Sequence, residues 1–181
     1  VGAIYIVRDP RNVLTSLMNH YSLNEDGALE MINSVYRNLK DDNDSNNYSN
    51  YSFISSWSNN YYSWKNSRDF NTLLIKYEDL QNDSENSFKK ILNFTNKIIF
   101  KEKRIEKQKF KLAIETTNFD VLKKQEENQG FEEAVYSSRD GKFKPFFYLG
   151  KKNNYKNLLK SKTITIIEKI FEKEMRELGY L

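Results

Sequence analysis

Apolar and polar positions follow one another along the chain in blocks that predict strands and helices in turn. A β-branched and aromatic run over 3–7 ends at Arg8, and a helical pattern follows over 10–21. Val, Ile and Tyr are typical of buried strands. Asp9 is a good N-cap, and Pro10 suits the first helical position because its missing N–H would have no partner there. The pattern therefore predicts a strand, a sharp junction at Arg8 and a helix.

The same spacing rules predict the remaining elements. A second buried strand is expected over 72–76, and a helix is expected to begin at a cap on Asp83 or Ser84. Further helices are expected over 28–39, 55–65, 103–116 and 163–178, with a turn over 24–27 and a polar loop over 41–52. Gly179 is a natural residue to end the last helix.

Several side chains are expected to point into the core. Trp57 and Trp64 fall on one stripe of the helix over 55–65, so both should be buried. Leu112 and Ala113 should face inward from the helix over 103–116. The aromatic residues of the helix over 55–65 are interpreted as core packing units rather than as a platform for nucleic-acid bases.

Two apolar strands with helices between and around them predict an α/β fold, a parallel sheet with helices on both faces. With 181 residues, 38% of them hydrophobic, the chain is large enough for one core and too small for two comfortable domains. Two strands alone are too few for a stable sheet of this kind.

Composition excludes several classes of function. The chain has no cysteine, which excludes disulfides, thiolate catalysis and cysteine–zinc sites. Its net charge is only +4, and its lysines are mixed with glutamates, so we expect a solvated surface and no nucleic-acid partner. No apolar run is long enough to span a membrane. A cytoplasmic protein is expected, with a membrane anchor upstream of Val1 left open.

Arg8 is the first candidate for binding chemistry. In open α/β sheets, ligands bind at the carboxyl edge, and a helix N-terminus at that edge favours anions. The guanidinium matches phosphate oxygens with paired donors, and the hydroxyl of Ser16, eight residues later, adds another donor. The alternative is that Arg8 pairs with Asp9 or a neighbouring carboxylate and that Ser16 is an ordinary helix residue.

Five segments of this chain, taken in order, resemble the sulfotransferases that use 3′-phosphoadenosine-5′-phosphosulfate (PAPS) as donor. The segment from Arg8 to Ser16 resembles the family's 3′-phosphate-binding segment. The others, in order, are Ser55–Trp57 with Trp64, Leu73–Leu80, Thr116–Phe119 and Phe146–Asn157. They resemble the family's G-S-W…W-W helix, its strand ending in Y-E-D-[LM], its T-S-F segment and its F-x-R-K-G-x-x-G-D-W-K-N segment.

The resemblance implies a three-layer α/β domain, similar to P-loop nucleotide hydrolases, of which residues 1–181 are the C-terminal two-thirds. The first strand, the phosphosulfate loop (T-Y-P-K-S-G-T-x-W) and the catalytic histidine would then lie upstream, which makes this chain an N-terminally incomplete fragment, inactive by itself. No G-x-x-x-x-G-K-[ST] loop occurs here. We assign no catalytic residue to this chain, and His20, its only histidine, is interpreted as a packing or surface residue.

The resemblance also implies a set of donor-binding residues. Arg8 and Ser16 would bind the 3′-phosphate, and Tyr77 would contact the adenine. Thr117 and Phe119 would flank the adenine by a hydrogen bond and by stacking. The remaining two are Asn118, which replaces the family's usual serine, and Gly150, whose backbone would approach the 3′-phosphate.

One departure from the family pattern concerns charge. Tyr148 and Leu149 stand where the family usually has arginine and lysine. Lys151 and Lys152 follow at once, and whether either replaces the missing pair is left open.

These observations favour a sulfotransferase that moves a sulfuryl group from PAPS to a hydroxyl or amine acceptor without a metal. The acceptor is open among carbohydrates, lipids, small molecules and proteins. Two alternatives remain: a noncatalytic nucleotide-binding or scaffold module that retains the fold, and a phosphotransferase similar to P-loop kinases.

Overall fold

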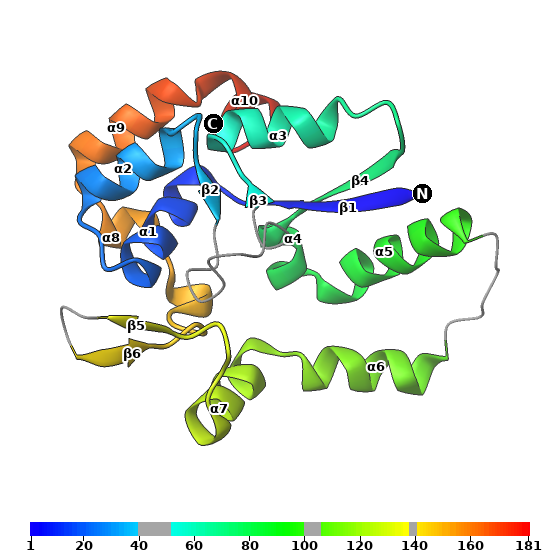
Figure 1. Cartoon of the computed structure of the whole chain (residues 1–181). Helices are drawn as coiled ribbons and strands as arrows, with labels where there is room; N and C mark the ends of the chain where they lie inside the picture. The colour runs from blue at the N-terminus through cyan, green and yellow to red at the C-terminus, as the bar shows by residue number, and fades with distance from the viewer. Residues whose placement is uncertain (40–51, 100–105, 138–140) are drawn as a thin grey trace, which may run out of the picture.

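Two parallel strands form the centre of the molecule. The computed structural model describes residues 1–39, 52–99, 106–137 and 141–181. β1 (Gly2–Val7) pairs in parallel with β4 (Asn71–Lys76), so that Val7 lies opposite Lys76 (Figure 1). Both predicted strands are confirmed. Because β1 and β4 run in the same direction, their carboxyl ends meet at one edge of the sheet.

The first helix begins as the sequence predicts. α1 spans Pro10–His20, and the Asp9 side chain caps it by accepting a hydrogen bond from the Arg11 backbone N–H at 2.9 Å. The proline at the first helical position needs no partner for its nitrogen. The junction between β1 and α1 therefore consists of Arg8 and Asp9 alone.

The second helix begins and ends earlier than expected. α2 spans Glu25–Asn33, and the Asn24 side chain caps it by accepting from the Gly27 N–H at 2.8 Å. The expected turn over 24–27 is thus a helix start, which asparagine at the cap and acidic residues in the first turn favour. The helix expected over 28–39 is wrong after Asn33: Tyr36 is 84% exposed, and nothing in the core holds it in a helix.

A short hairpin and a helix follow. β2 (Asn38–Leu39) pairs antiparallel with β3 (Ser52–Phe53). The loop predicted over 41–52 lies outside the described residues except for Ser52, which belongs to β3. α3 (Trp57–Lys65) is capped by Ser56.

Only one of the two tryptophans is buried. Trp57 is buried at the start of α3, as predicted. Trp64 is 38% exposed, so its predicted burial is wrong. It lies in the last turn of α3 and stacks on the Tyr5 ring with a centroid distance of 5.9 Å, covering one side of Tyr5 rather than entering the core.

α4 (Tyr77–Asn82) starts directly at the end of β4, and α5 (Ser84–Ile98) follows it. Asp83 caps α5, as predicted. In Figure 1, α5 lies on one side of the two central strands, and α3, α9 and α10 lie on the other. The described elements make a mixed α/β fold with a small parallel sheet.

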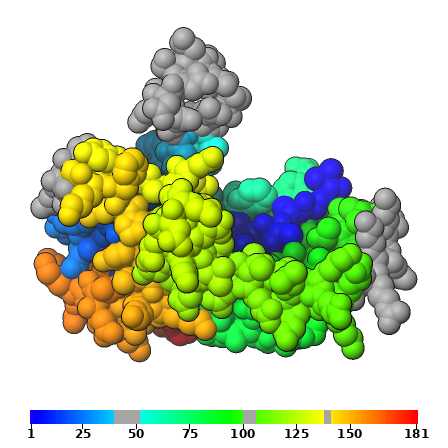
Figure 2. Space-filling view, turned by 90° about the horizontal axis from the view of Figure 1, so that it is seen from below, coloured from blue at the N-terminus to red at the C-terminus, as the bar shows by residue number. Residues whose placement is uncertain are grey.

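The segment after α5 lies at the periphery. It comprises α6 (Lys107–Thr116), α7 (Phe119–Gln129) and a hairpin of β5 (Val135–Ser137) with β6 (Lys142–Lys144). Seen from below, these elements extend across the front of the molecule, and part of β1 stays visible behind them (Figure 2). The inward direction predicted for Leu112 and Ala113 is wrong: both are exposed, Leu112 at 59%, because α6 lies away from the buried core.

The C-terminal region covers the core. It consists of the single-turn helix η2 (Gly150–Lys152), α8 (Tyr155–Leu158), α9 (Ser161–Ile170) and α10 (Glu172–Glu177). The single helix expected over 163–178 is interrupted at Phe171, whose φ of −109° and ψ of 20° depart from helical values. Gly179, at φ +70°, follows the last helix, as predicted.

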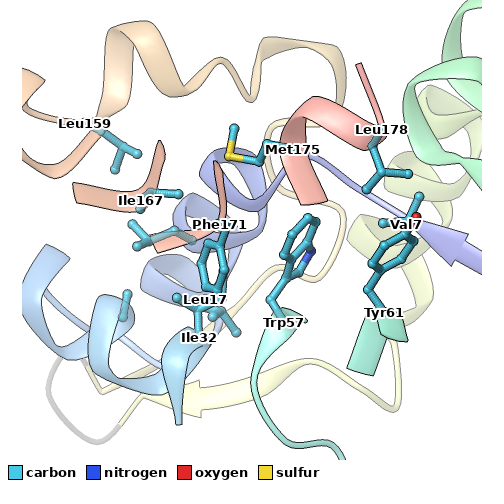
Figure 3. Packing of buried hydrophobic residues seen from close by; sticks show 12 residues of the cluster. Val7, Leu17, Ile32, Trp57, Tyr61, Leu159, Ile167, Phe171, Met175 and Leu178 are labelled. Atoms are coloured by element: carbon cyan, nitrogen blue, oxygen red, sulfur yellow. The ribbon is translucent and has the colours of Figure 1, made fainter. Parts of the chain in front are cut away.

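The main core lies between α1, α2, α3 and the C-terminal helices (Figure 3). Trp57 and Phe171 pack at its centre with ring centroids 5.2 Å apart. The other large buried side chains are Val7, Leu14, Leu17, Ile32, Tyr61, Leu159, Ile167, Met175 and Leu178. The indole N–H of Trp57 also donates to the carbonyl of Arg8 at 3.2 Å. The core therefore fixes the backbone of the β1–α1 junction.

Candidate functional site

Arg8 stands at the carboxyl edge of the parallel sheet, next to the residue that follows β4. Its neighbour in sequence, Asp9, donates its backbone N–H to Glu78 Oε1 at 3.2 Å, which ties the end of β1 to the start of α4. The side chain of Arg8 is half-buried at this edge. This is the position at which open α/β sheets bind ligands.

Three of the predicted site residues come together here. Nη1 of Arg8 donates to the Ser16 hydroxyl at 3.2 Å, and the guanidinium carbon lies 4.3 Å from the centre of the Tyr77 ring. The Ser16 hydroxyl in turn donates to the Asn12 carbonyl at 3.1 Å. A guanidinium on an aromatic face keeps the donors at its edge directed outward, where they can meet an anion.

Arg8 lacks the carboxylate partner that the alternative interpretation requires. Asp9 pairs instead with Arg11, whose Nη2 lies 2.7 Å from Asp9 Oδ2. Among the described residues Arg8 makes no ion pair, and its buried Nε–H has no hydrogen-bond partner. A buried donor without a partner costs about 1–3 kcal/mol, so the protein groups around Arg8 do not satisfy its guanidinium fully.

Asn153 joins this cluster, although the sequence did not single it out. Its Nδ2 donates to the Ser16 hydroxyl at 3.1 Å and to the Asn12 carbonyl at 3.3 Å, while its Oδ1 accepts from the Thr15 hydroxyl at 2.5 Å. Both ends of the amide are engaged, so its orientation is fixed. The available signal was its place in the segment 146–157, three residues after Gly150.

Gly150 and Phe119 form a second pair. Gly150 has a φ of +54°, and a Cβ added there would lie 2.5 Å from Cε1 of the Phe119 ring. Only glycine fits this position without a shift of the ring. Gly150 starts η2, and the Asn153 N–H closes this turn on the Gly150 carbonyl at 3.1 Å. The short segment 150–153 thus contacts the Phe119 ring through Gly150 and the Ser16 hydroxyl through Asn153.

Thr117 and Asn118 are not brought to Arg8 by any described contact. The Thr117 hydroxyl donates to the Ala113 carbonyl at 2.6 Å, and Asn118 caps α7 by accepting from the Asp120 N–H at 3.0 Å. Both residues are exposed. Their described hydrogen bonds hold the ends of α6 and α7, and their contact with a nucleotide stays a prediction.

Positive charge lies beside the departure at Tyr148 and Leu149. Lys151 and Lys152 are exposed on η2, between Gly150 and Asn153. A further lysine, missed from the sequence, is Lys123 on α7, whose ammonium donates to the Tyr148 carbonyl at 3.2 Å. Residues 148 and 149 are therefore uncharged themselves, but the three lysines lie close to them in the sequence or in the fold.

His20 packs against aromatic rings. Its imidazole lies edge-on to Tyr21, with centroids 4.7 Å apart, and edge-on to Phe146 at 6.4 Å. Burial lowers the pKa of His20 below its ordinary value. These contacts agree with its interpretation as a packing residue. In the described ranges, no group of three or more His, Cys, Asp and Glu side chains could hold a metal ion, and no helix is long and apolar enough to cross a membrane.

Comparison with solved structures finds a mouse sulfotransferase, SULT7A1, complexed with PAP. The superposition has a TM-score of 0.60 at 20% sequence identity and covers 96% of this chain. The present chain spans 57% of the length of the mouse chain. At this identity, the likeness shows a shared fold.

Comparison with family models is more direct. A search of curated proteins found no significant match. The model of the sulfotransferase domain, however, matches residues 2–179, which is nearly the whole sequence. The predicted resemblance is therefore confirmed, and the chain belongs to the sulfotransferase domain family.

Proposed function

We propose that this protein transfers a sulfuryl group from PAPS to a hydroxyl or amine acceptor, and that Arg8 and Ser16 bind the 3′-phosphate of the donor. The observation that carries the proposal is the contact between these two side chains at the carboxyl edge of the sheet, with Arg8 unpaired by any described carboxylate. Family membership and the PAP bound by the similar mouse enzyme support it.

The proposed position of the phosphate is beside the Arg8–Ser16 hydrogen bond. A phosphate oxygen between the two side chains would accept from Arg8 and, after rotation of the hydroxyl away from the Asn12 carbonyl, from Ser16. Asn153 Nδ2 donates to the same hydroxyl at 3.1 Å and holds the Ser16 side chain in place. Charge-assisted hydrogen bonds of this kind are the strong ones in anion sites.

The adenosine would extend from this phosphate toward α7. Tyr77 is proposed to contact the adenine from the end of β4, with Phe119 stacking on it and Thr117 and Asn118 at its edge. Gly150 is proposed to approach the 3′-phosphate with its backbone, and it also leaves space for the Phe119 ring that a Cβ would take. No metal is part of this proposal.

The proposed chemistry is an in-line displacement at sulfur. A bond forms between the acceptor oxygen or nitrogen and the sulfur atom, the bridging S–O bond to the 5′-phosphate breaks, and a base takes the acceptor proton. The products are the sulfated acceptor and PAP. We propose that the 5′-phosphosulfate loop, the base and further strands of a three-layer, P-loop-like sheet lie outside residues 1–181, and that this segment alone is inactive.

A noncatalytic nucleotide-binding module is the second candidate function. The observation that favours it is the loss of the basic pair at Tyr148 and Leu149, which removes two charged side chains from positions where the family usually has them. Such a module would bind PAP through the same residues without transferring sulfate.

The test is a transfer assay with the full-length protein, labelled PAPS and one acceptor from each class: carbohydrate, lipid, small phenol and protein. Calorimetry with PAP runs beside it. Binding together with transfer supports the enzyme, and binding without transfer to any acceptor supports the noncatalytic module. Absence of PAP binding would contradict the assignment of the site.

A further inference from the structure

Two carboxylates belong to residues next to the Arg8 site, Asp9 beside Arg8 and Glu78 beside Tyr77, and both are engaged by other groups. Asp9 pairs with Arg11, which reaches it through Nε at 3.0 Å and through Nη2 at 2.7 Å. Glu78 accepts from the Asp9 N–H through one oxygen and from the Tyr180 hydroxyl, at 2.9 Å, through the other. The described hydrogen bonds of both carboxylates therefore go to groups other than Arg8.

Arg11 holds its position through contacts with the C-terminal region. Its Nη1 pairs with Glu168 at 2.5 Å, its Nη2 donates to the Tyr180 carbonyl at 3.0 Å, and its guanidinium carbon lies 4.1 Å from the centre of the Tyr155 ring. The side chains of Arg11 and Asp9 are only 6% and 7% exposed. Burial would lower the pKa of Arg11, but the hydrogen bond and charge of Asp9 and the hydrogen bond to Glu168 raise it overall, so the guanidinium stays charged.

A buried carboxylate requires a cation or strong donors close to it. Without Arg11 the Asp9 carboxylate would need another cation, and Arg8 is the arginine adjacent to it in sequence. Asp9 would then bind Arg8 and compete with an entering anion. The anion would bind less tightly as a result.

We propose that Arg11 is a positioning residue: its ion pair with Asp9 keeps the Arg8 guanidinium unpaired and available to an anionic ligand. The identity of that ligand as the 3′-phosphate of PAP rests on the function proposed above. Arg11 touches no ligand in this account. It acts through Asp9, while its ion pair with Glu168 on α9 holds it in place.

The experiment uses the full-length protein and four variants: Arg11→Gln, Asp9→Asn, the double variant and Glu168→Gln. Asparagine keeps the helix cap at residue 9. Glu168→Gln is the matched control, because it breaks the other ion pair of Arg11 and leaves its pair with Asp9 intact. Affinity is measured by calorimetry for PAP and for adenosine 5′-phosphate, which lacks the 3′-phosphate, and folding by thermal melting.

The Arg11→Gln variant should bind PAP at least about tenfold more weakly, the effect of about 1.4 kcal/mol, while its affinity for adenosine 5′-phosphate stays the same. The double variant should return to within about threefold of the wild type, because the unpaired carboxylate is gone. Glu168→Gln should melt earlier and bind PAP normally. Equal PAP binding by Arg11→Gln and the wild type, or no recovery in the double variant, overturns the proposal.

Two measurements keep the proposal testable if these results are blocked. If Arg11→Gln does not fold, Asp9→Asn alone decides: the proposal expects PAP affinity at or above the wild-type value, and a loss of PAP affinity that accompanies a loss of stability overturns it.

If the wild type does not bind PAP, the proposed function fails, and NMR of the arginine side chains tests the role of Arg11 separately. The Arg8 Nε–H should then exchange more slowly with water in Arg11→Gln and return to the wild-type rate in the double variant. An unchanged rate overturns the proposal.

Discussion

Nη1 of Arg8 donates a hydrogen bond to the hydroxyl of Ser16 at 3.2 Å, across the junction between the first strand and the first helix. Ser16 lies on the same face of α1 as Asn12, four residues earlier, so that face points toward the carboxyl edge of the sheet. The long side chain of Arg8 extends along it. A strand-end arginine and a helix hydroxyl thus meet where an anion would bind.

Ser16→Ala should lower PAP affinity about fivefold to tenfold, the effect of a single hydrogen bond worth about 1 kcal/mol. The measurement is calorimetry on the full-length protein. Thr165→Ala is the matched control, because Thr165 also donates to the carbonyl four residues earlier, at 3.1 Å, but on an exposed face of α9. Equal affinities for the Ser16 and Thr165 variants would remove Ser16 from the site.

Gly150→Ala should destabilise the protein by more than the backbone strain alone, since the new Cβ meets the Phe119 ring at 2.5 Å. Gly179→Ala is the control: its φ is +70°, and its nearest contact is the flexible end of Lys76 at 3.9 Å. We expect the free energy of unfolding to fall by about 1–3 kcal/mol more for Gly150→Ala. Urea unfolding measures both, and combining Gly150→Ala with Phe119→Ala should remove the difference. Equal losses for the two glycine variants would mean that the ring moves aside freely.

The two tryptophans should differ sharply in their contribution to stability. Trp57→Ala removes a buried ring from the core and should lower the free energy of unfolding by about 3–5 kcal/mol. Trp64→Ala removes a ring that is 38% exposed and stacked on Tyr5, an interaction worth about 0.5–1.5 kcal/mol. Urea unfolding of both variants checks this order, and a larger loss for Trp64→Ala would contradict the packing of α3.

Tyr5 should make the fold sensitive to alkali. Burial raises the pKa of Tyr5 to about 12, and its hydroxyl donates to Asn60 Oδ1 at 2.9 Å. Because the pKa is raised on folding from about 10, the stabilisation is complete below about pH 10 and is lost as the pH rises toward 12. Relative to Tyr5→Phe, the wild type should lose about 1–2 kcal/mol between about pH 9 and pH 11.5, less than full burial would give. Urea unfolding of both proteins at each pH measures this loss. An equal change in the free energy of unfolding of the two proteins between about pH 9 and pH 11.5 would count against burial of the hydroxyl.

Local signals predicted the elements that carry the site. The apolar run over 3–7, the cap at Asp9 and the proline after it define β1 and α1. These signals are local, because each acts on residues that are close to it in sequence. The meeting of Arg8 and Ser16 also follows from this short segment. Helix ends without such signals were less predictable: α2 stops at Asn33 because the residues that follow have no core to pack against.

Contacts between distant segments were beyond sequence reasoning. Arg11 pairs with Glu168, 157 residues later, and Asn153 reaches Ser16 across 137 residues. Neither pairing leaves a periodic or spacing signal in the chain. Leu112 shows the reverse case, since its helical stripe predicts burial and only the peripheral place of α6 explains its exposure.

Binding of the 3′-phosphate by Arg8 is measured by combining one variant with one change in the ligand. Calorimetry compares PAP with adenosine 5′-phosphate for the full-length wild type, for Arg8→Ala and for Arg176→Ala, a surface control whose arginine pairs with Glu172. The wild type and the control should prefer PAP. Arg8→Ala should lose about 10- to 100-fold of that preference, the effect of a charge-assisted hydrogen bond of about 1.5–3 kcal/mol. An unchanged preference for PAP in Arg8→Ala would contradict the account.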